Sequence, residues 1–206
     1  GNNFDIPAST VKNNHDRSNS DVCLLPIVPL EIEGCFMTEY AVLDKEIHHT
    51  FIESSLVKEL ELRPLPTDIV LDGIFGSSRV SSKVEFEIQS AQNGNRCYLE
   101  ALIVPKINTS RRQPDYIDLP NNSQLADLPV VTGPYPNARI LIGLDNDHLL
   151  LPYETRSCQD DCENVLFAEK TFLGWTLRAR INEFVFDRDN DKHDMLRCDN
   201  DICSSC

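Results

Sequence analysis

The sequence predicts an all-β domain with one or two short helices. Apolar and polar residues alternate strictly through Val84, Phe86 and Ile88, which is typical of a half-buried strand. Further apolar runs of strand length recur along the chain, and turn signals such as Asn93-Gly94-Asn95 separate them. The chain has 206 residues, of which 41% are hydrophobic. This length and this composition are sufficient for one domain with a substantial core.

We assign residues 23–181 to this single domain. Residues 1–22 carry many Asn, Ser and Asp side chains and few large apolar ones, so we expect a disordered lead-in. Residues 182–206 form an acidic, Cys-rich tail that has little to pack against a core.

The first elements lead to an acidic residue. Residues 24–32 and 35–43 predict two strands joined by a turn, and the second strand ends at Asp44. Residues 51–60 have apolar side chains at helical spacing, with Thr50 placed as a helix N-cap. We therefore expect a hairpin, an acidic turn and then a short helix.

The remaining elements are mostly strands. Three strands joined by glycine-bearing turns are predicted over residues 68–76, 80–89 and 96–104. Residues 105–136 predict a long connection rich in Pro, Asn and Asp. Apolar runs at 138–145 and 170–180 predict two more strands, the last containing the only tryptophan.

Composition limits the classes of partner. A formal charge of −14 and a pI near 4.7 disfavour nucleic acid and anionic membrane surfaces, which attract clustered Lys and Arg. No apolar run approaches 18 residues and no secretory signal is visible, although a removed signal stays open. We expect a cytoplasmic location, and with it reduced, buried thiols at Cys23, Cys35 and Cys97.

Four segments, taken in order, carry a resemblance to a known family. They are Ala41-Val42-Leu43-Asp44 continuing to Phe51-Ile52, the glycines Gly73 and Gly76, Leu125-Ala126-Asp127 with Ile140-Leu141-Ile142-Gly143-Leu144-Asp145, and Thr171-Phe172-Leu173-Gly174-Trp175. Over residues 24–180 the chain resembles the retropepsin-type aspartic protease domain of BEL/Pao retrotransposon polyproteins and nematode domains derived from it. The resemblance implies a closed β-barrel with a flap and places the catalytic carboxylate at Asp44.

The chain departs from the family at the catalytic signature. Where the family has Ser and Gly after the acid, this chain has Lys45 and Glu46. The resemblance implies a homodimer in which two acids share one proton, and a lysine within ion-pair reach would oppose retention of that proton. Glu46 adds bulk and charge where glycine would let a substrate backbone pass. We therefore expect a catalytically inactive domain that serves in dimerisation or in binding an extended peptide.

Two other functions stay open. One is an active homodimeric aspartic endopeptidase that uses Asp44 to process a retrotransposon polyprotein. The other is a Cys-rich extracellular binding domain. The segment 172–177 could pair with a second copy across a two-fold axis, or it could close the barrel of a monomer. Without the resemblance, Asp44 would be an ordinary turn or capping acid.

We expect no cofactor and no metal site. His48 and His49 are adjacent and lack partners nearby, so solvated or partly buried side chains are expected. The triplet Asp187, Asp189 and Asp191 lacks the glycine of a calcium loop, because Lys192 stands there. A metal, disulfides or free thiols all remain open for the late group His193, Cys198, Cys203 and Cys206, with Cys158 and Cys162 upstream.

Overall fold

The computed structural model describes residues 24–73, 76–108, 116–119, 123–133, 137–159, 165–180 and 195–197. The expected lead-in, most of the tail, and the late cysteines other than Cys158 lie outside these residues, as does Cys23. Within the described part of the chain, no helix is long and apolar enough to cross a membrane.

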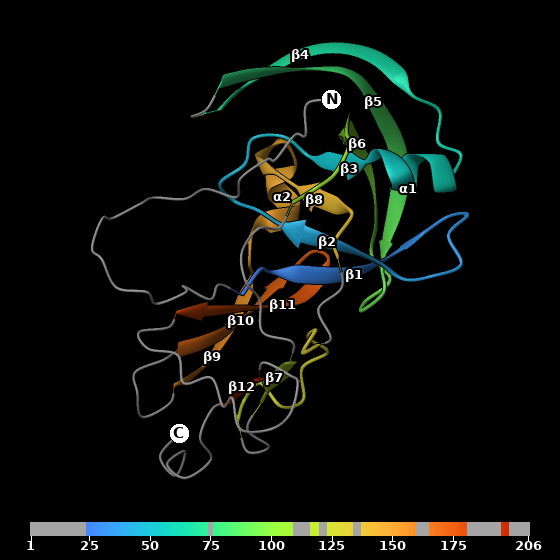
Figure 1. The fold of residues 1–206 in the computed structure, drawn as a ribbon. Helices are drawn as coiled ribbons and strands as arrows, with labels where there is room; N and C mark the ends of the chain where they lie inside the picture. The colour runs from blue at the N-terminus through green and yellow to red at the C-terminus, as the bar shows by residue number, and fades with distance from the viewer. Residues whose placement is uncertain are drawn as a thin grey trace.

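The described chain is mostly β, as predicted, with two short α-helices (Figure 1). The elements are β1 (Ile27–Ile32), β2 (Glu39–Leu43), β3 (Phe51–Glu53), α1 (Ser54–Glu59), β4 (Leu65–Gly73), β5 (Gly76–Ser90), β6 (Arg96–Val104), β7 (Tyr116–Asp118), β8 (Ile140–Ile142), the 3₁₀ turn η1 (Leu144–Asn146), α2 (Asp147–Leu150), β9 (Glu154–Gln159), β10 (Val165–Thr171), β11 (Gly174–Arg180) and β12 (Met195–Arg197).

A seven-stranded sheet holds seven of the twelve described strands. Its order is β1-β2-β8-β3-β6-β5-β4, and β1 also pairs with β5. The first six strands therefore close into a ring, while β4 is attached only through β5. Strands β9, β10 and β11 form a separate three-stranded sheet, and β7 pairs with β12.

The β4–β5 hairpin extends beyond the ring as a long arm. Strand β5 pairs with β6 only from Lys83 to Gln89, whereas its pairing with β4 continues to Gly76 opposite Gly73. In Figure 1 this arm curves over the ring. A register shift between Pro66 and Ile69 interrupts the ladder, and such irregularities bend a hairpin.

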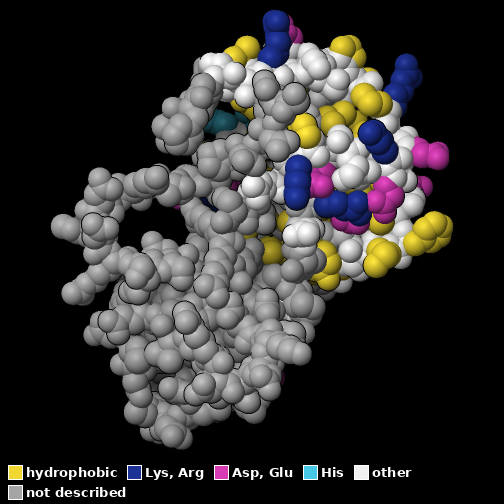
Figure 2. All heavy atoms as spheres, in the orientation of Figure 1, with side chains coloured by type: hydrophobic (Ala, Val, Ile, Leu, Met, Phe, Trp, Pro, Cys, Tyr) yellow, Lys and Arg dark blue, Asp and Glu magenta, His cyan; other side chains and the backbone are white. Residues whose placement is uncertain are grey.

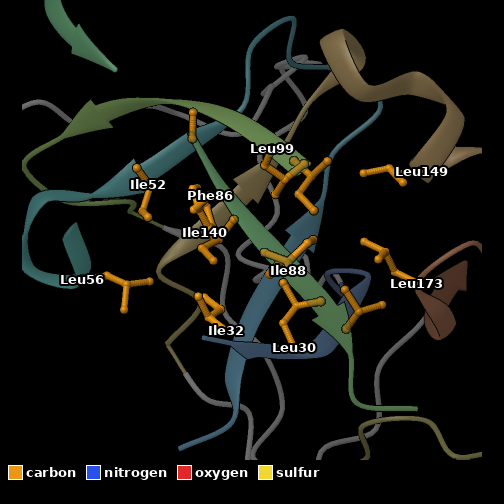
Figure 3. Close-up of a cluster of buried hydrophobic side chains, with 14 of the residues drawn as sticks. Leu30, Ile32, Ile52, Leu56, Phe86, Ile88, Leu99, Ile140, Leu149 and Leu173 are labelled. Carbon is orange, nitrogen blue, oxygen red and sulfur yellow. The ribbon is translucent and has the colours of Figure 1, made fainter. Parts of the chain in front are cut away.

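Alternation along the strands fills the ring. Side chains from strands far apart in sequence, among them Leu30, Ile52, Ile88 and Ile140, are all fully buried and point into one cluster (Figure 3). Leu149 of α2 and Leu173, between β10 and β11, join the same cluster. Removing large apolar side chains from water is the main force that holds such a ring together, at roughly 1.5–3 kcal/mol for each.

The prediction of a helix from residue 51 was wrong in its first turn. Phe51 and Ile52 form β3, which pairs with β6 on one side and with β8 on the other. Helix α1 begins only at Ser54, and its N-cap is Glu53 rather than Thr50. Pairing on both edges satisfies the backbone of this segment, and the side chains of Ile52 and Phe51 are buried in clusters on its two faces. These gains outweigh the local helical spacing.

Other boundaries also differ from the predictions. The strand predicted over 35–43 begins at Glu39, and the one predicted over 138–145 contains only Ile140–Ile142 as strand. The strand predicted over 170–180 is the end of a hairpin, because Gly174 has φ +111° and turns the chain. Strands β7 and β9, helix α2, and β12 within the predicted tail were not foreseen.

Candidate functional site

Asp44 lies at the end of two parallel strands. Strand β2 pairs in parallel with β8, so that Leu43 stands opposite Ile142. The backbone N–H of Asp44 continues the ladder by donating to the carbonyl of Ile142 at 2.9 Å. The acid is therefore placed by the sheet and not by a flexible loop. We call residues 44–50, between β2 and β3, the acid turn.

The carboxylate of Asp44 shapes its own turn. Its Oδ1 accepts the backbone N–H of Glu46 at 2.8 Å, a local bond of the Asx-turn kind. Asp44 is half-buried, and the side chain of Glu46 is exposed. One carboxylate oxygen is thus committed to holding the turn.

The far side of the acid turn is bonded to the chain that leaves β8. Leu144 donates its N–H to the carbonyl of Ile47 at 2.8 Å, and Asp145 donates to that of His48 at 3.0 Å. These bonds fix the turn along its length, since Asp44 is already bonded to Ile142 at the other end.

Thr50 closes the acid turn through a fully bonded hydroxyl. It is 0% exposed, and its N–H and hydroxyl donate to the two carboxylate oxygens of Asp145 at 2.8 and 2.6 Å. The hydroxyl oxygen in turn accepts from the N–H of Gly143 and from the amide of Asn146. Because both oxygens of Asp145 are engaged, this carboxylate anchors the turn and is not a free second acid.

Gly143 lets the acid turn pass close to β8. A Cβ atom built at this position would lie 2.5 Å from the carbonyl oxygen of His49 and 2.8 Å from that of Ile47. Real Cβ atoms do not approach backbone so closely, so a side chain here would push the turn away. Close approach of the backbone therefore explains the glycine that ends the Ile140-Leu141-Ile142-Gly143 segment.

Lys45 pairs with an acid that is far from Asp44 in the sequence. Its ammonium is 3.1 Å from Glu169 Oε2 of β10. Glu169 Oε2 is also 3.2 Å from Arg178 Nε of β11, close enough for an ion pair although not aligned for a hydrogen bond. Among the residues that the structure describes, no ion pair joins Lys45 to Asp44. Lys45 instead ties the acid turn to the three-stranded sheet.

An apolar cluster joins the acid turn to the β4–β5 arm. It lies on the opposite face of the strands from the ring interior, because Val42 alternates with the inward Ala41 and Leu43. We call it the arm cluster; Val80 of β5 is buried in it, and Ile47 of the acid turn packs against it. Its other members near the turn and the arm are Phe51, Leu141, Ile69 and Leu71.

The two histidines of the acid turn differ in their surroundings. His48 is exposed, and the ring of His49 packs edge-on against Phe51 with the centroids 6.5 Å apart. Within the described ranges, the one group with metal-ligand spacing is Cys35, Glu39 and Glu59. The guanidinium of Arg139 lies within that group.

Arg139 binds both of these acids. Its guanidinium bonds to both carboxylate oxygens of Glu39, which is 6% exposed, and to Glu59 Oε2 at 2.6 Å. The hydrogen bond from Arg139 lowers the pKa of Glu59, and Glu39 above all raises the pKa of Arg139. The positive charge that a metal would supply is already present, so we interpret the group as a structural ion-pair cluster.

The expected buried thiols at Cys35 and Cys97 are only partly buried in the structure. Cys35 and Cys97 are free and half-buried against the ring core. Burial raises the pKa of Cys97 to about 11, with a smaller contribution from the charge of Glu87. Cys158 is buried on β9.

Charges on the described surface are mixed. Figure 2 shows Lys and Arg side chains beside Asp and Glu side chains, with apolar groups between them. Several of these charges pair across neighbouring strands, as Arg79 does with Asp68 and Arg96 with Glu87. Exposed pairs of this kind contribute little to stability, about 0–1 kcal/mol each.

The structure keeps Asp44, Lys45 and Glu46 together in the acid turn and adds residues that the sequence analysis missed. Thr50 had been assigned to a helix cap, and the partners Asp145 and Glu169 are 95 and 124 residues from their contacts. In the sequence, only the position of Asp145 two residues after Gly143 hinted at a role. No protein-family model matches the chain, and comparison with curated proteins finds no match.

Proposed function

We propose that this chain is a retropepsin-like domain of BEL/Pao type that holds an extended peptide segment and does not hydrolyse it. One observation carries the proposal. Asp44 stands at the end of paired strands, where the resembling family has its catalytic acid, but the exposed, charged side chain of Glu46 follows two residues later, where that family has glycine.

The arrangement of the resembling segments supports the relationship. Strand β8 lies between β2 and β3, so Ile140–Ile142 and the two strands around the acid turn are direct neighbours. In the Thr171-x-x-Gly174-Trp175 segment, the local turn explains why Thr and Gly stand at these positions. The Thr171 hydroxyl donates to the Gly174 carbonyl at 3.2 Å, and Gly174 supplies the left-handed backbone of the turn.

The contacts of the acid turn argue against hydrolysis. Aspartic proteases need two carboxylates that share a proton in a protected place. Within this chain Asp145 cannot supply the second acid, because Thr50 binds both of its carboxylate oxygens. Glu46 also places a charged side chain where the family has glycine, and a substrate backbone would have to pass it.

The arm and the acid turn provide the features that an extended peptide uses. Strand addition supplies backbone hydrogen bonds, while side-chain contacts supply selectivity. The arm cluster offers partly exposed aliphatic side chains at Ile47, Ile69 and Leu71. The net charge of −14 attracts basic segments at long range. We therefore expect preference for an extended peptide that has aliphatic side chains and flanking Lys or Arg.

Cleavage and binding assays with a peptide library test the proposal. The wild type, Asp44→Asn, and the double variant Lys45→Ser with Glu46→Gly are compared at acid pH, with Lys58→Ser on the exposed face of α1 as the control. We expect no cleavage by the wild type, and binding of aliphatic peptides that Asp44→Asn leaves unchanged. Pepstatin-sensitive cleavage that disappears in Asp44→Asn would instead establish the active endopeptidase, and no peptide binding would remove the proposed role.

A further inference from the structure

The β10–β11 hairpin of this chain lies against its own acid turn, and we propose that the domain is a self-contained monomer whose site is not completed by a second copy. The inference rests on the proposed function, because the retropepsin relationship is what implies a two-chain site. Two independent sets of contacts carry it.

The first contact involves the residue directly after Asp44. Lys45 reaches Glu169 of β10 at 3.1 Å, and the Glu169 side chain is only 19% exposed. In a two-chain site the acid turns of both copies must come close enough for their carboxylates to share a proton. Here the chain's own hairpin already contacts the acid turn at that residue.

The second contact involves the edge of β11, the strand expected to pair across a two-fold axis. The N–H of Trp175 donates to Gln92 Oε1 at 2.6 Å, and the Trp175 carbonyl accepts from Gln92 Nε2 at 2.9 Å. Gln92 lies in the turn between β5 and β6. Its side-chain amide bonds to both main-chain groups of Trp175 as a neighbouring strand would, so this position of the edge is capped within the chain.

Further bonds fix the hairpin to the ring. Asn93 and Asn95 both donate their side-chain amides to the carbonyl of Phe172, at 3.1 and 2.8 Å. The Ser90 hydroxyl donates to the carbonyl of Leu173 at 2.8 Å. Leu173 is 0% exposed and belongs to the core cluster that also holds Leu43, the residue before Asp44. The hairpin is thus part of the same folded body as the acid turn, which favours closure by the chain itself over pairing with a second copy.

Solution mass tests the inference on the wild-type chain. Light scattering coupled to size exclusion, from micromolar to near-millimolar concentration, should give the single-chain mass of 23.3 kDa throughout. Twice that mass would overturn the inference. The readout is independent of the peptide assays, so a monomer that binds no peptide removes only the proposed function, and a dimer that binds peptide removes only this inference.

Hydrogen exchange at Trp175 tests the cap itself. In Gln92→Ala the Trp175 amide loses its acceptor, and we expect its exchange to become about tenfold faster, the effect of losing one buried hydrogen bond. Gln89→Ala is the matched control, since the side-chain amide of Gln89 donates to Glu31 at the surface. An unchanged Trp175 amide in Gln92→Ala would mean that another strand protects this edge, and would contradict the inference.

Discussion

Thr50 donates both its backbone N–H and its hydroxyl to the carboxylate of Asp145, which lies 95 residues further along the chain. The two residues lie at the ends of segments that meet only in the folded state, one leading into β3 and one leaving β8. Because the Thr50 hydroxyl also accepts from Gly143 and Asn146, one side chain organises the end of the acid turn.

Replacing Thr50 by valine should destabilise the fold strongly. The change keeps the volume but leaves the partners of a 0% exposed hydroxyl without their hydrogen bonds. We expect a loss of about 2–4 kcal/mol in the free energy of unfolding, measured by urea denaturation. The matched control is Thr38→Val at an exposed position, where a change within about 0.5 kcal/mol is expected. Equal losses in the two variants would show that the hydrogen bonds of Thr50 do not contribute to the free energy of unfolding.

Two glycines should differ in how they tolerate alanine. At Gly143 the new methyl would lie 2.5 Å from the His49 carbonyl oxygen, so the acid turn must move, and we expect a loss of about 3 kcal/mol or more. At Gly34 nothing lies within 4 Å, and only the positive φ of +86° opposes alanine, at about 1 kcal/mol. Thermal or chemical denaturation of both variants measures the difference. A smaller effect at Gly143 than at Gly34 would contradict the close approach described above.

Removing Arg139 should leave an acid buried without its partner. Glu39 is 6% exposed and both its oxygens bond to the guanidinium, so we expect Arg139→Met to lower the free energy of unfolding by roughly 3 kcal/mol. The control Arg96→Met removes an exposed partner of Glu87. We expect it to change the free energy of unfolding by about 1 kcal/mol or less. Adding Glu39→Leu to Arg139→Met should recover much of the loss, and failure to do so would point to lost packing instead.

The same variant should change the titration of Glu59. Arg139 lowers the pKa of Glu59 from its ordinary value of 4.5, so the pair stabilises the folded state above that pH. This contribution disappears as the pH falls through the lowered folded-state pKa. Carboxyl NMR titration should therefore show the pKa of Glu59 rising in Arg139→Met, and an unchanged titration would exclude the ion pair in solution.

Cys97 should react slowly with thiol reagents near neutral pH. Burial raises its pKa to about 11 from the ordinary value of 9.0, and the thiolate is the reactive form. Alkylation followed by peptide mass spectrometry should show native Cys97 labelled well only in strongly alkaline solution. As the pH rises above about 9, the thiol of Cys97 ionises in the unfolded chain before it ionises in the folded one. The free energy of unfolding should therefore fall between about pH 9 and pH 11. Rapid labelling of the folded protein at neutral pH would contradict the buried setting.

Local patterns predicted the elements whose environment matches their own spacing. The alternation of Val84, Phe86 and Ile88 marks the inward face of β5, and Arg96–Val104 is a strand with the predicted bounds. Residues 51–53 were misread because helical spacing and a short two-sided strand look alike over three residues. Pairing with both β6 and β8 decided between them, and neither partner lies nearby in the sequence.

The candidate site divides in the same way. The residue types at Asp44, Lys45 and Glu46, with their break from the pattern that the chain otherwise resembles, can be read directly from the sequence. Their partners cannot, because hydrogen bonds and ion pairs depend on distances in space. Lys45 follows Asp44 directly in the sequence, yet its ion-pair partner is Glu169 of β10.

The β character of this protein, the position of its acid after a buried strand, and the side chains that follow that acid can all be read along the chain. These are matters of composition, period and order along the chain. Three features depend instead on the folded state: six strands close into a ring, Asp145 binds Thr50, and the β10–β11 hairpin lies against the acid turn. The physical reason is that burial and long-range pairing set these contacts, and their energies appear only when distant segments meet.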